Sequence, residues 1–161
     1  MRITTRWMAL MVILSALTIT PATGFAQIEF LGFPVITGAQ VDYNDIPSVY
    51  IDRPRLKDIF SILLDNALYY RHPKLTLHIR IYGELKAGRV IYRVADNGVG
   101  IPAECRERVF GVFERLQVHD DQNSTGIGLA IVRRIIESCG GSVSLQETPG
   151  GGTTVLFDLP G

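Results

Sequence analysis

The sequence predicts one compact domain of the α+β class. Its 161 residues are 47% hydrophobic and 20% charged, which is enough apolar material for one sizeable core. Some long stretches repeat apolar residues at the three- and four-residue spacing of a helix, while shorter stretches alternate apolar and polar residues as strands do. The sequence contains no internal repeat and no low-complexity linker that would divide the domain.

Bulk charge gives no reason to expect a nucleic acid or an anionic surface as partner. The 16 basic and 16 acidic side chains cancel to a formal net charge of zero. Cys105 and Cys139 form no C-x-x-C pair and have no histidine cluster nearby, so neither a zinc site nor a disulfide framework is indicated. Any phosphate-binding site must therefore depend on local features.

The first 26 residues differ in pattern from the rest. Arg2 and Arg6 precede an uncharged stretch at 7–28, and small residues close the leader at 24–26. This layout is typical of a secretory signal peptide or an anchor, although Pro21 and several threonines make it a poor membrane span. A non-native leader, a mis-assigned start and a folded segment of the core remain alternatives. The expected organisation is a leader at 1–26, a linker at 27–37 and the domain at 38–160.

Short strands followed by a long helix are expected in the first part of the domain. Residues 35–41 and 47–51 are predicted to be strands, separated by the polar turn 42–45. Asp52 can cap a helix that Pro73 would close. The apolar residues that recur at helical spacing are Leu56, Ile59, Phe60, Leu63, Leu64 and Ala67.

The second part of the domain should contain another long helix and more strands. Gly140 and Gly141 suit the end of this helix because glycine readily adopts the left-handed conformation found there. Val132, Ile135, Ile136 and Cys139 would form its apolar face. The expected order is strand 75–84, turn 86–88, strand 89–95, helix 126–139, strand 142–147, turn 149–152 and strand 153–159.

Residues 96–102, DNGVGIP, directly follow the predicted strand 89–95. Asp96 offers a carboxylate acceptor, while Gly98 and Gly100 allow positive φ angles and a close approach of the backbone to a flat ligand. A fixed carboxylate suits an exocyclic amine. The same letters also form ordinary turns, so this motif alone leaves a ligand site and a simple turn open.

Residues 124–129, STGIGL, place two glycines at the start of the predicted helix 126–139. Unpaired N–H groups and the positive end of the helix dipole favour an anion such as phosphate at this position. A Rossmann fingerprint would need glycine where Ile131 stands, and a Walker loop would need Gly-Lys-Ser/Thr, which the sequence lacks. A different nucleotide-binding scheme is therefore indicated.

Taken together, these motifs resemble the ATP-binding domain of histidine kinases, a branch of the GHKL or Bergerat-fold superfamily, over residues 38–160. The matching blocks are LLDNALYYR (63–71, asparagine box), DNGVGIP (96–102, first glycine box), VFGVFERL (109–116, phenylalanine box), STGIGLAIVRRIIESCGG (124–141, second glycine box) and PGGGTTVLFDLP (149–160, final strand). The phenylalanine box and a short lid favour the kinase branch over gyrase-, Hsp90- and mismatch-repair-type relatives. The resemblance implies a two-layer α/β sandwich with a mixed, mainly antiparallel sheet packed on about three helices.

The resemblance also implies ATP and Mg²⁺ as cofactors. Asp96 would accept from the adenine amino group, and Asn66 would be the metal ligand and the catalytic residue. Phe110 and Phe113 would anchor a lid at 115–125, although an ordinary core role for both phenylalanines remains open. Arg133 and Arg134 are expected to form a solvated helix face. The implied cofactor-binding residues are Asn66, Asp96, Gly98, Gly100, Ile101, Phe113, Thr125, Gly126, Ile127, Gly128, Leu129 and Thr153.

The chain departs from the family pattern at Ile62, Tyr69 and Ser124. Ile62 stands where the family usually has an amide or carboxylate that orders the metal. Tyr69 stands where the family usually has a lysine for the phosphates, and Ser124 replaces the glycine that opens the second glycine box. These departures put phosphoryl transfer in more doubt than nucleotide binding.

The sequence therefore predicts the ATP·Mg-binding catalytic domain of a truncated sensor histidine kinase. In two-component signalling it would donate the γ-phosphoryl group to a histidine on a separate dimerisation domain, and a response regulator would be an indirect partner. None of His72, His78 and His119 lies in the sequence context of such an acceptor. A non-catalytic nucleotide-binding module and a degraded kinase fragment are the alternatives. We expect a cytoplasmic location, with membrane association through 7–26 left open.

Overall fold

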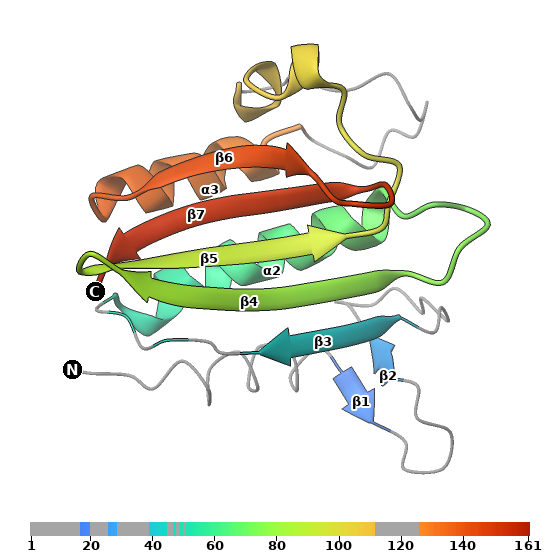
Figure 1. The fold of residues 1–161 in the computed structure, drawn as a ribbon, viewed down its shortest axis with the longest axis horizontal. Helices are drawn as coiled ribbons and strands as arrows, with labels where there is room; N and C mark the ends of the chain where they lie inside the picture. The colour runs from blue at the N-terminus through green and yellow to red at the C-terminus, as the bar shows by residue number, and fades with distance from the viewer. Residues whose placement is uncertain are drawn as a thin grey trace.

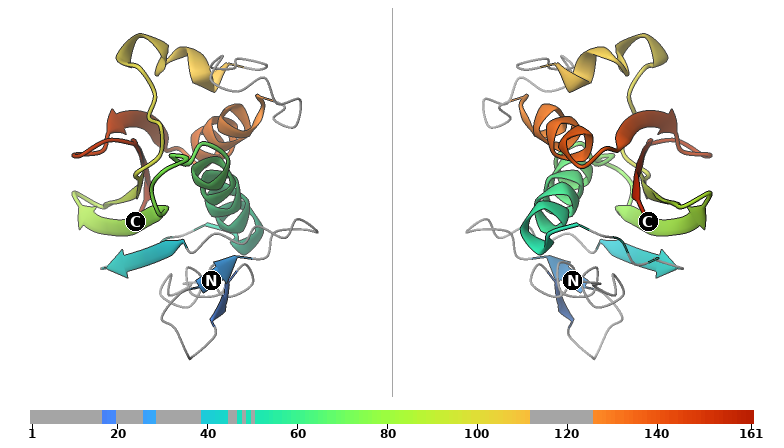
Figure 2. Two further views of the ribbon diagram at one scale, coloured as in Figure 1. Left: turned by 90° about the vertical axis from the view of Figure 1, so that its right-hand side faces the viewer. Right: turned by 90° about the vertical axis from the view of Figure 1, so that its left-hand side faces the viewer.

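The computed structural model has two layers, a five-stranded sheet and a pair of α-helices that cover one face of it (Figures 1 and 2). It describes residues 17–19, 26–28, 39–44, 47, 49, 51–111 and 126–161. The helices are α2 (Arg53–Tyr69) and α3 (Gly128–Ser138), with short 3₁₀ helices η1 (Ala103–Cys105) and η2 (Arg108–Phe110). The strands of the sheet are β3 (Gln40–Asn44), β4 (His78–Lys86), β5 (Arg89–Asp96), β6 (Ser142–Glu147) and β7 (Thr153–Pro160). A separate antiparallel pair is formed by β1 (Leu17–Ile19) and β2 (Ala26–Ile28).

The sheet is mixed and mainly antiparallel, which confirms the predicted fold class. Its strand order is β3-β4-β5-β7-β6, and only the β3–β4 pair is parallel. Ala87 and Gly88 join β4 to β5 with positive φ angles of 51° and 72°, as a tight two-residue hairpin requires. Because β5 and β7 are central neighbours, the end of β5 lies beside the start of β7 (Figure 1).

The core lies between the sheet and the two helices. All of the predicted apolar positions of α2 are buried. The ring of Phe60 meets the rings of Tyr92 on β5 and Phe157 on β7 edge-on, with both pairs of centroids 5.9 Å apart. Edge-to-face pairs of this kind are favourable beyond the area that they bury. The aromatic contacts therefore fix α2 against the two central strands that carry the site.

The ends of the helices agree largely with the sequence. The backbone N–H of Arg55 donates to Oδ1 of Asp52 at 3.0 Å, so the predicted N-cap of α2 is confirmed. The prediction that Pro73 closes this helix is wrong, because α2 ends at Tyr69. The carbonyl of Tyr70 accepts the N–H of Val99 at 3.0 Å, so it bonds to the loop after β5 and not to a further turn of α2. Gly140, with φ 74°, follows α3 as predicted.

The segment before α2 differs from the prediction. Residues 42–44 belong to β3 and are not a turn, because β3 pairs in parallel with β4 and sets Asp42 opposite Arg80. Oδ2 of Asp42 also lies 2.7 Å from Nε2 of His78 across the same pair of strands. An edge strand tolerates such polar residues, since its outer side is not packed in the core. Of the strand predicted at 47–51, the structure describes residues 47, 49 and 51; Val49 forms an isolated β-bridge, and no continuous strand is assigned to these residues.

The predicted leader and linker fall mainly outside the described residues, so both stay predictions. Within the part of the chain that the structure describes, no helix is long and apolar enough to cross a membrane.

Candidate functional site

Asp96, the last residue of β5, carries a carboxylate held by two backbone groups. The N–H groups of Gly98 and Thr153 donate to its Oδ1 at 2.8 and 3.1 Å. Burial raises the pKa of Asp96, against the lowering effect of these two hydrogen bonds. Among the described residues nothing donates to Oδ2. The carboxylate is therefore fixed through one oxygen, and its other oxygen accepts from none of the described residues.

Glycines let three segments meet at this carboxylate. A Cβ on Gly98 would lie 2.5 Å from the carbonyl oxygen of Tyr70, at the end of α2. A Cβ on Gly152 would overlap the carbonyl oxygen of Asp96 and lie 2.8 Å from Cα of Asn97, and its φ of 102° disfavours other residues as well. Gly100 likewise has a positive φ, of 79°. Sequence reasoning missed Gly152 as a site residue, although the run of glycines before Thr153 was its available signal.

Asn97 also fixes the loop that follows Asp96, and sequence reasoning missed it as a site residue. Its Oδ1 accepts the N–H of His78 at 2.7 Å, and its Nδ2 donates to the carbonyl of Thr76 at 2.9 Å. Both partners lie at the entry to β4, so Asn97 ties the end of β5 to the neighbouring strand. Residues 96–98 are thus held by hydrogen bonds to β4 and β7, which a simple turn would not need.

Asn66 lies where α2 meets the start of α3. A Cβ on Gly128 would lie 3.6 Å from Oδ1 of Asn66 and 3.0 Å from Cγ2 of Ile62, so glycine permits the close contact of the two helices. The Nδ2 atom of Asn66 is buried and has no hydrogen-bond partner in the described part of the chain. A buried amide without a partner is rare in folded proteins and calls for an explanation, such as a ligand.

The start of α3 presents backbone N–H groups that no side chain caps. Ile127 occupies the N-cap position without a side-chain hydrogen bond, and Gly126 precedes it with φ 65°. Leu129 and Ile101 are partly buried and pack against the core. Thr125, Ser124, Phe113 and the predicted lid at 115–125 lie outside the described residues.

The end of α2 links Asn66 to the loop that follows Asp96. Tyr70 donates its N–H to the carbonyl of Asn66 at 2.9 Å, and the carbonyl of Tyr70 accepts from Val99, next to Gly98. Asn66 and the loop after Asp96 are thus joined by consecutive backbone hydrogen bonds. Asn66 therefore lies beside the uncapped start of α3 and is linked through Tyr70 to the loop that follows Asp96.

Phe110 and the two arginines of α3 lie beside the proposed site. Phe110 is 5% exposed and belongs to the core, which agrees with the core reading of this phenylalanine. Arg134 is exposed as predicted. Arg133 is 38% exposed, so it lies on the solvated face as predicted, but its guanidinium group also lies over the ring of Phe110, 5.1 Å from the centroid, which the sequence did not predict.

The residues present fit a nucleotide with its magnesium ion. No group of three or more His, Cys, Asp and Glu side chains that could hold a metal occurs in the described ranges. The amide oxygen of Asn66 is a described atom that could hold a metal at this site, together with oxygens of the nucleotide and of water. Mg²⁺ suits this, since it commonly takes one or two protein oxygens together with phosphate oxygens and water.

Comparisons with known proteins give a consistent result. Residues 51–161 match the family of histidine kinase-, DNA gyrase B- and HSP90-like ATPases. The methanogenesis regulatory histidine kinase FilI of Methanothrix harundinacea is 40% identical over 118 residues, which are 71% of this chain and 13% of that protein.

Two solved structures share the fold. The mycobacterial sensor histidine kinase MprB has a TM-score of 0.68 at 25% identity, over 76% of this chain and 84% of that one. Full-length ShkA in complex with AMPPNP has a TM-score of 0.63 at 27% identity, over 76% of this chain and 26% of that one. The chain spans a small part of the length of the curated relatives that it matches first, 16% and 13%.

Proposed function

The chain belongs to the family of histidine kinase-, DNA gyrase B- and HSP90-like ATPases, and from this premise we propose that it is the ATP-binding catalytic domain of a sensor histidine kinase. The family assignment confirms the resemblance that its motifs indicate. The observation that carries the proposal is the carboxylate of Asp96, which is fixed through Oδ1 and free to accept at Oδ2. The AMPPNP bound to ShkA, a structural relative, supports an adenine nucleotide as the ligand.

Asp96 would select adenine through its second oxygen. An exocyclic amine can donate to Oδ2, whereas the corresponding carbonyl oxygen of guanine would face it with a lone pair. A hydrogen bond to a charged group is worth about 1.5–3 kcal/mol, so this one contact can discriminate strongly between the two bases. Gly98, Gly100 and Thr153 would support it by fixing the carboxylate and keeping the backbone close to the base.

Asn66 and the start of α3 would bind the phosphate end of the nucleotide. The uncapped N–H groups of Gly128 and its neighbours and the positive dipole end favour phosphate oxygens. Oδ1 of Asn66 would hold Mg²⁺, and its unpaired Nδ2 could donate to a phosphate oxygen. Asn66 would thus hold the ion beside the phosphates, and the chemistry it would supply there is neutralisation of charge that develops on the phosphoryl group.

Phosphoryl transfer would require positioning more than a protein base. A ring nitrogen of the acceptor histidine forms the new N–P bond with its own lone pair while the bond from the γ-phosphorus to the β–γ bridging oxygen breaks and ADP leaves. The chain would hold the nucleotide in line for this attack. Described histidines of this chain bond locally, His72 to the N–H of Lys74 and His78 to Asp42. This supports an acceptor on a separate dimerisation domain, with a response regulator acting downstream.

The test is transfer in trans. The chain, a histidine-bearing helical hairpin domain and ATP labelled at the γ-phosphate are mixed, and label on the hairpin is followed with time. We expect labelled hairpin that forms only when the chain is present. Tight ATP binding without any labelled hairpin would contradict the kinase proposal and favour a non-catalytic nucleotide-binding module.

That module is the second candidate, and Ile62 is the observation that favours it. Its Cγ2 atom lies beside Gly128, next to Asn66, where a polar side chain would be expected in an active kinase. An alkyl group there can order neither the metal nor the phosphates. A chain of this kind could still bind ATP and modulate a kinase or regulator.

We also propose a cytoplasmic location, because an ATP site is useful only where ATP is present. Membrane association through residues 7–26 remains part of the proposal as an alternative to a cleaved leader. Fusion of alkaline phosphatase to the end of the chain tests the location, since this reporter is active only after export. An active fusion would contradict the cytoplasmic assignment.

A further inference from the structure

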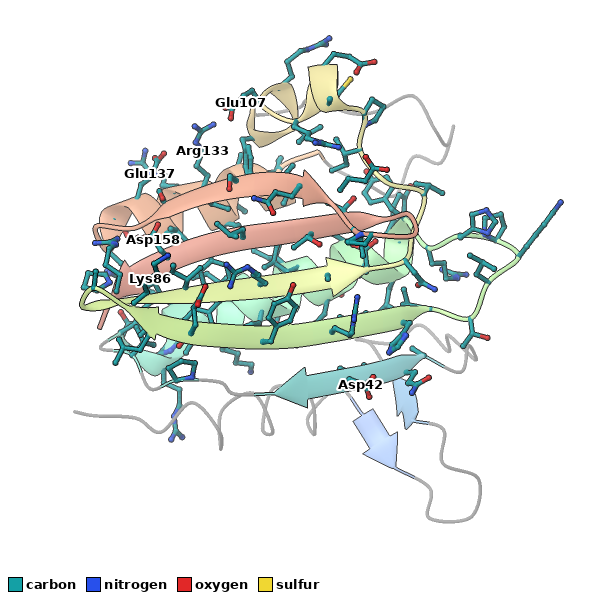
Figure 3. The ribbon with its side chains drawn as sticks, viewed as in Figure 1. Asp42, Lys86, Glu107, Arg133, Glu137 and Asp158 are labelled. Carbon is teal, nitrogen blue, oxygen red and sulfur yellow. The ribbon has the colours of Figure 1, made fainter. Side chains whose placement is uncertain are left out.

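Arg133 on α3 is held by three side chains from two parts of the fold. Its Nε donates to Oε1 of Glu137 at 3.0 Å, one turn later on the same helix. Its Nη1 lies 3.6 Å from Oε2 of Glu107, and its guanidinium group stacks over Phe110. Figure 3 shows Arg133 between Glu107 and Glu137. Because Glu107 and Phe110 precede residues 112–125 and Arg133 follows them, Arg133 joins segments that are distant in sequence.

The segment that Arg133 holds leads away from the adenine side of the proposed site. This segment, 101–110, begins directly after Gly100 and contains η1 and η2. At its start, Nε of Arg106 donates to the carbonyl of Ile101 at 3.2 Å, and Nη2 of Arg106 lies 3.7 Å from Oε2 of Glu147 on β6. Arg106 thus ties the segment to β6, while the next residue, Glu107, and Phe110 contact Arg133 on α3.

We propose that Arg133 is a positioning residue for ATP. By holding the segment 101–110 against α3, it fixes the start of α3, where phosphate would bind, relative to Asp96, where adenine would bind. This inference rests on the proposed function. Arg133 itself lies in the second turn of α3 and touches other side chains of the protein, so its effect on ATP is indirect.

The chemistry of arginine suits this role better than that of lysine. A planar guanidinium group can stack on an aromatic ring and keep its edges for carboxylates, as Arg133 does with Phe110, Glu107 and Glu137. A lysine ammonium is a compact charge that cannot make the flat contact and both ion pairs together. Lysine at 133 would therefore preserve the local charge but loosen the link.

A comparison of the affinities for adenosine and for ATP distinguishes a positioning role of Arg133 from a general effect on stability. Adenosine needs only the Asp96 end of the site, whereas ATP needs both ends at the right separation. Titration calorimetry on the full chain with Mg²⁺ present would compare the two ligands for Arg133→Met and Arg133→Lys. Arg134→Met is the matched control, since Arg134 is the adjacent exposed arginine.

We expect Arg133→Met to weaken ATP about tenfold and Arg133→Lys about threefold, with adenosine affinity changed less than about twofold in both. Arg134→Met should change neither ligand. Should Arg133→Met fold poorly, Phe110→Leu removes the ring but keeps an apolar core side chain, and it should also weaken ATP selectively.

Several results would overturn the inference. Equal losses for ATP and adenosine would indicate a purely structural role, and an unchanged ATP affinity in Arg133→Met and in Phe110→Leu would remove any role. Wild-type ATP affinity in Arg133→Lys would show that only charge matters. A wild-type chain that binds neither ligand would overturn the proposed function itself, and this inference with it.

Discussion

Oδ1 of Asp96, at the end of β5, accepts the backbone N–H of Thr153, at the start of β7, at 3.1 Å. The antiparallel register sets Ala95 opposite Thr154, so the two strands bring this donor and acceptor together as a direct result of sheet pairing. The carboxylate needs no reorganisation before a ligand arrives, because two paired strands of the sheet already orient it. Preorganised groups of this kind lose little conformational entropy on binding.

Replacing Asp96 by asparagine should remove adenine recognition while keeping the local fold. The amide oxygen can still accept from Gly98 and Thr153, but Nδ2 would then present a donor where Oδ2 presents an acceptor. We expect ATP affinity to fall about 10- to 100-fold, the equivalent of losing one hydrogen bond to a charged group. Titration with a fluorescent ATP analogue measures this change.

Asp58→Asn serves as the control, because Asp58 is an exposed acid on α2. It should leave ATP affinity unchanged. Asp96→Ala should be less stable than Asp96→Asn, since it leaves two partly buried N–H groups without their acceptor. Equal ATP affinity in the wild type and in Asp96→Asn would mean that adenine binds elsewhere.

Local patterns in the sequence predicted much of this fold. The apolar stripe of α2, its cap at Asp52 and the bounds of β6 follow from residue spacing and capping chemistry, and all are confirmed. Asp96 could also be singled out, because an acid and two glycines directly follow a strand. Its binding of adenine stays a prediction.

Features that depend on contacts between distant segments could not be predicted. Asp42 lies in β3 because of its pairing with β4, although its local sequence favours a turn. The need for glycine at 152 arises from the backbone of Asp96, and the position of Arg133 arises from Phe110, and neither partner is close in sequence. Tertiary contacts outweigh local propensity at such positions.

Gly152 offers a sharp test of this crowded contact. Gly152→Ala would place a methyl group against the carbonyl of Asp96, whereas Gly150→Ala meets nothing within 4 Å, although both glycines have positive φ. Both variants should lose about 1 kcal/mol of stability from backbone strain. Only Gly152→Ala should also displace the N–H of Thr153 from Asp96, and we expect it to weaken ATP at least about fivefold.

Thermal unfolding and ATP titration of the two variants distinguish these effects. Similar ATP affinity in Gly152→Ala and Gly150→Ala would show that the packing of Gly152 against Asp96 has no influence on the ligand.

Asp65, beside Asn66 on α2, gives the fold a predictable pH dependence. Burial raises the pKa of Asp65 to about 6, above its ordinary value of 3.8. The folded state therefore takes up this proton at a higher pH than the unfolded state, and the contribution of Asp65 to stability becomes more favourable as pH falls from about 6 to about 4. At neutral pH its charge destabilises the fold.

Asp65→Asn should consequently raise the free energy of unfolding at pH 7 by about 1 kcal/mol, a value discounted because the side chain is only half-buried. The gain should shrink as pH is lowered to about 4. Burial also raises the pKa of Asp96, so part of the pH dependence should remain in the variant. Denaturant unfolding at several pH values measures this, and a gain that does not change with pH would contradict the assignment.

Ile62 and Tyr69 should limit phosphoryl transfer more than ATP binding. Asp96 and the backbone N–H groups at the start of α3 bind through atoms that neither side chain supplies, so binding should persist. Transfer needs the metal and the γ-phosphoryl charge held in place, and one lost electrostatic contact of this kind typically costs about 2.7–4 kcal/mol. The double variant Ile62→Asn with Tyr69→Lys should therefore increase transfer to a hairpin domain in trans at least about tenfold, with little change in ATP affinity.

Each single variant belongs in the experiment, because both side chains would act on the same phosphate group and their effects need not add. Ile62 packs closely against Gly128, since a Cβ on Gly128 would lie 3.0 Å from Cγ2 of Ile62. Asparagine is no larger than isoleucine, so it can occupy position 62 without separating α2 from α3. Ser61→Asn adds the same amide one position earlier, on a different face of α2, and should leave transfer unchanged. A full rate in the unaltered chain, or no gain in the double variant at wild-type ATP affinity, would show that transfer does not depend on these two positions.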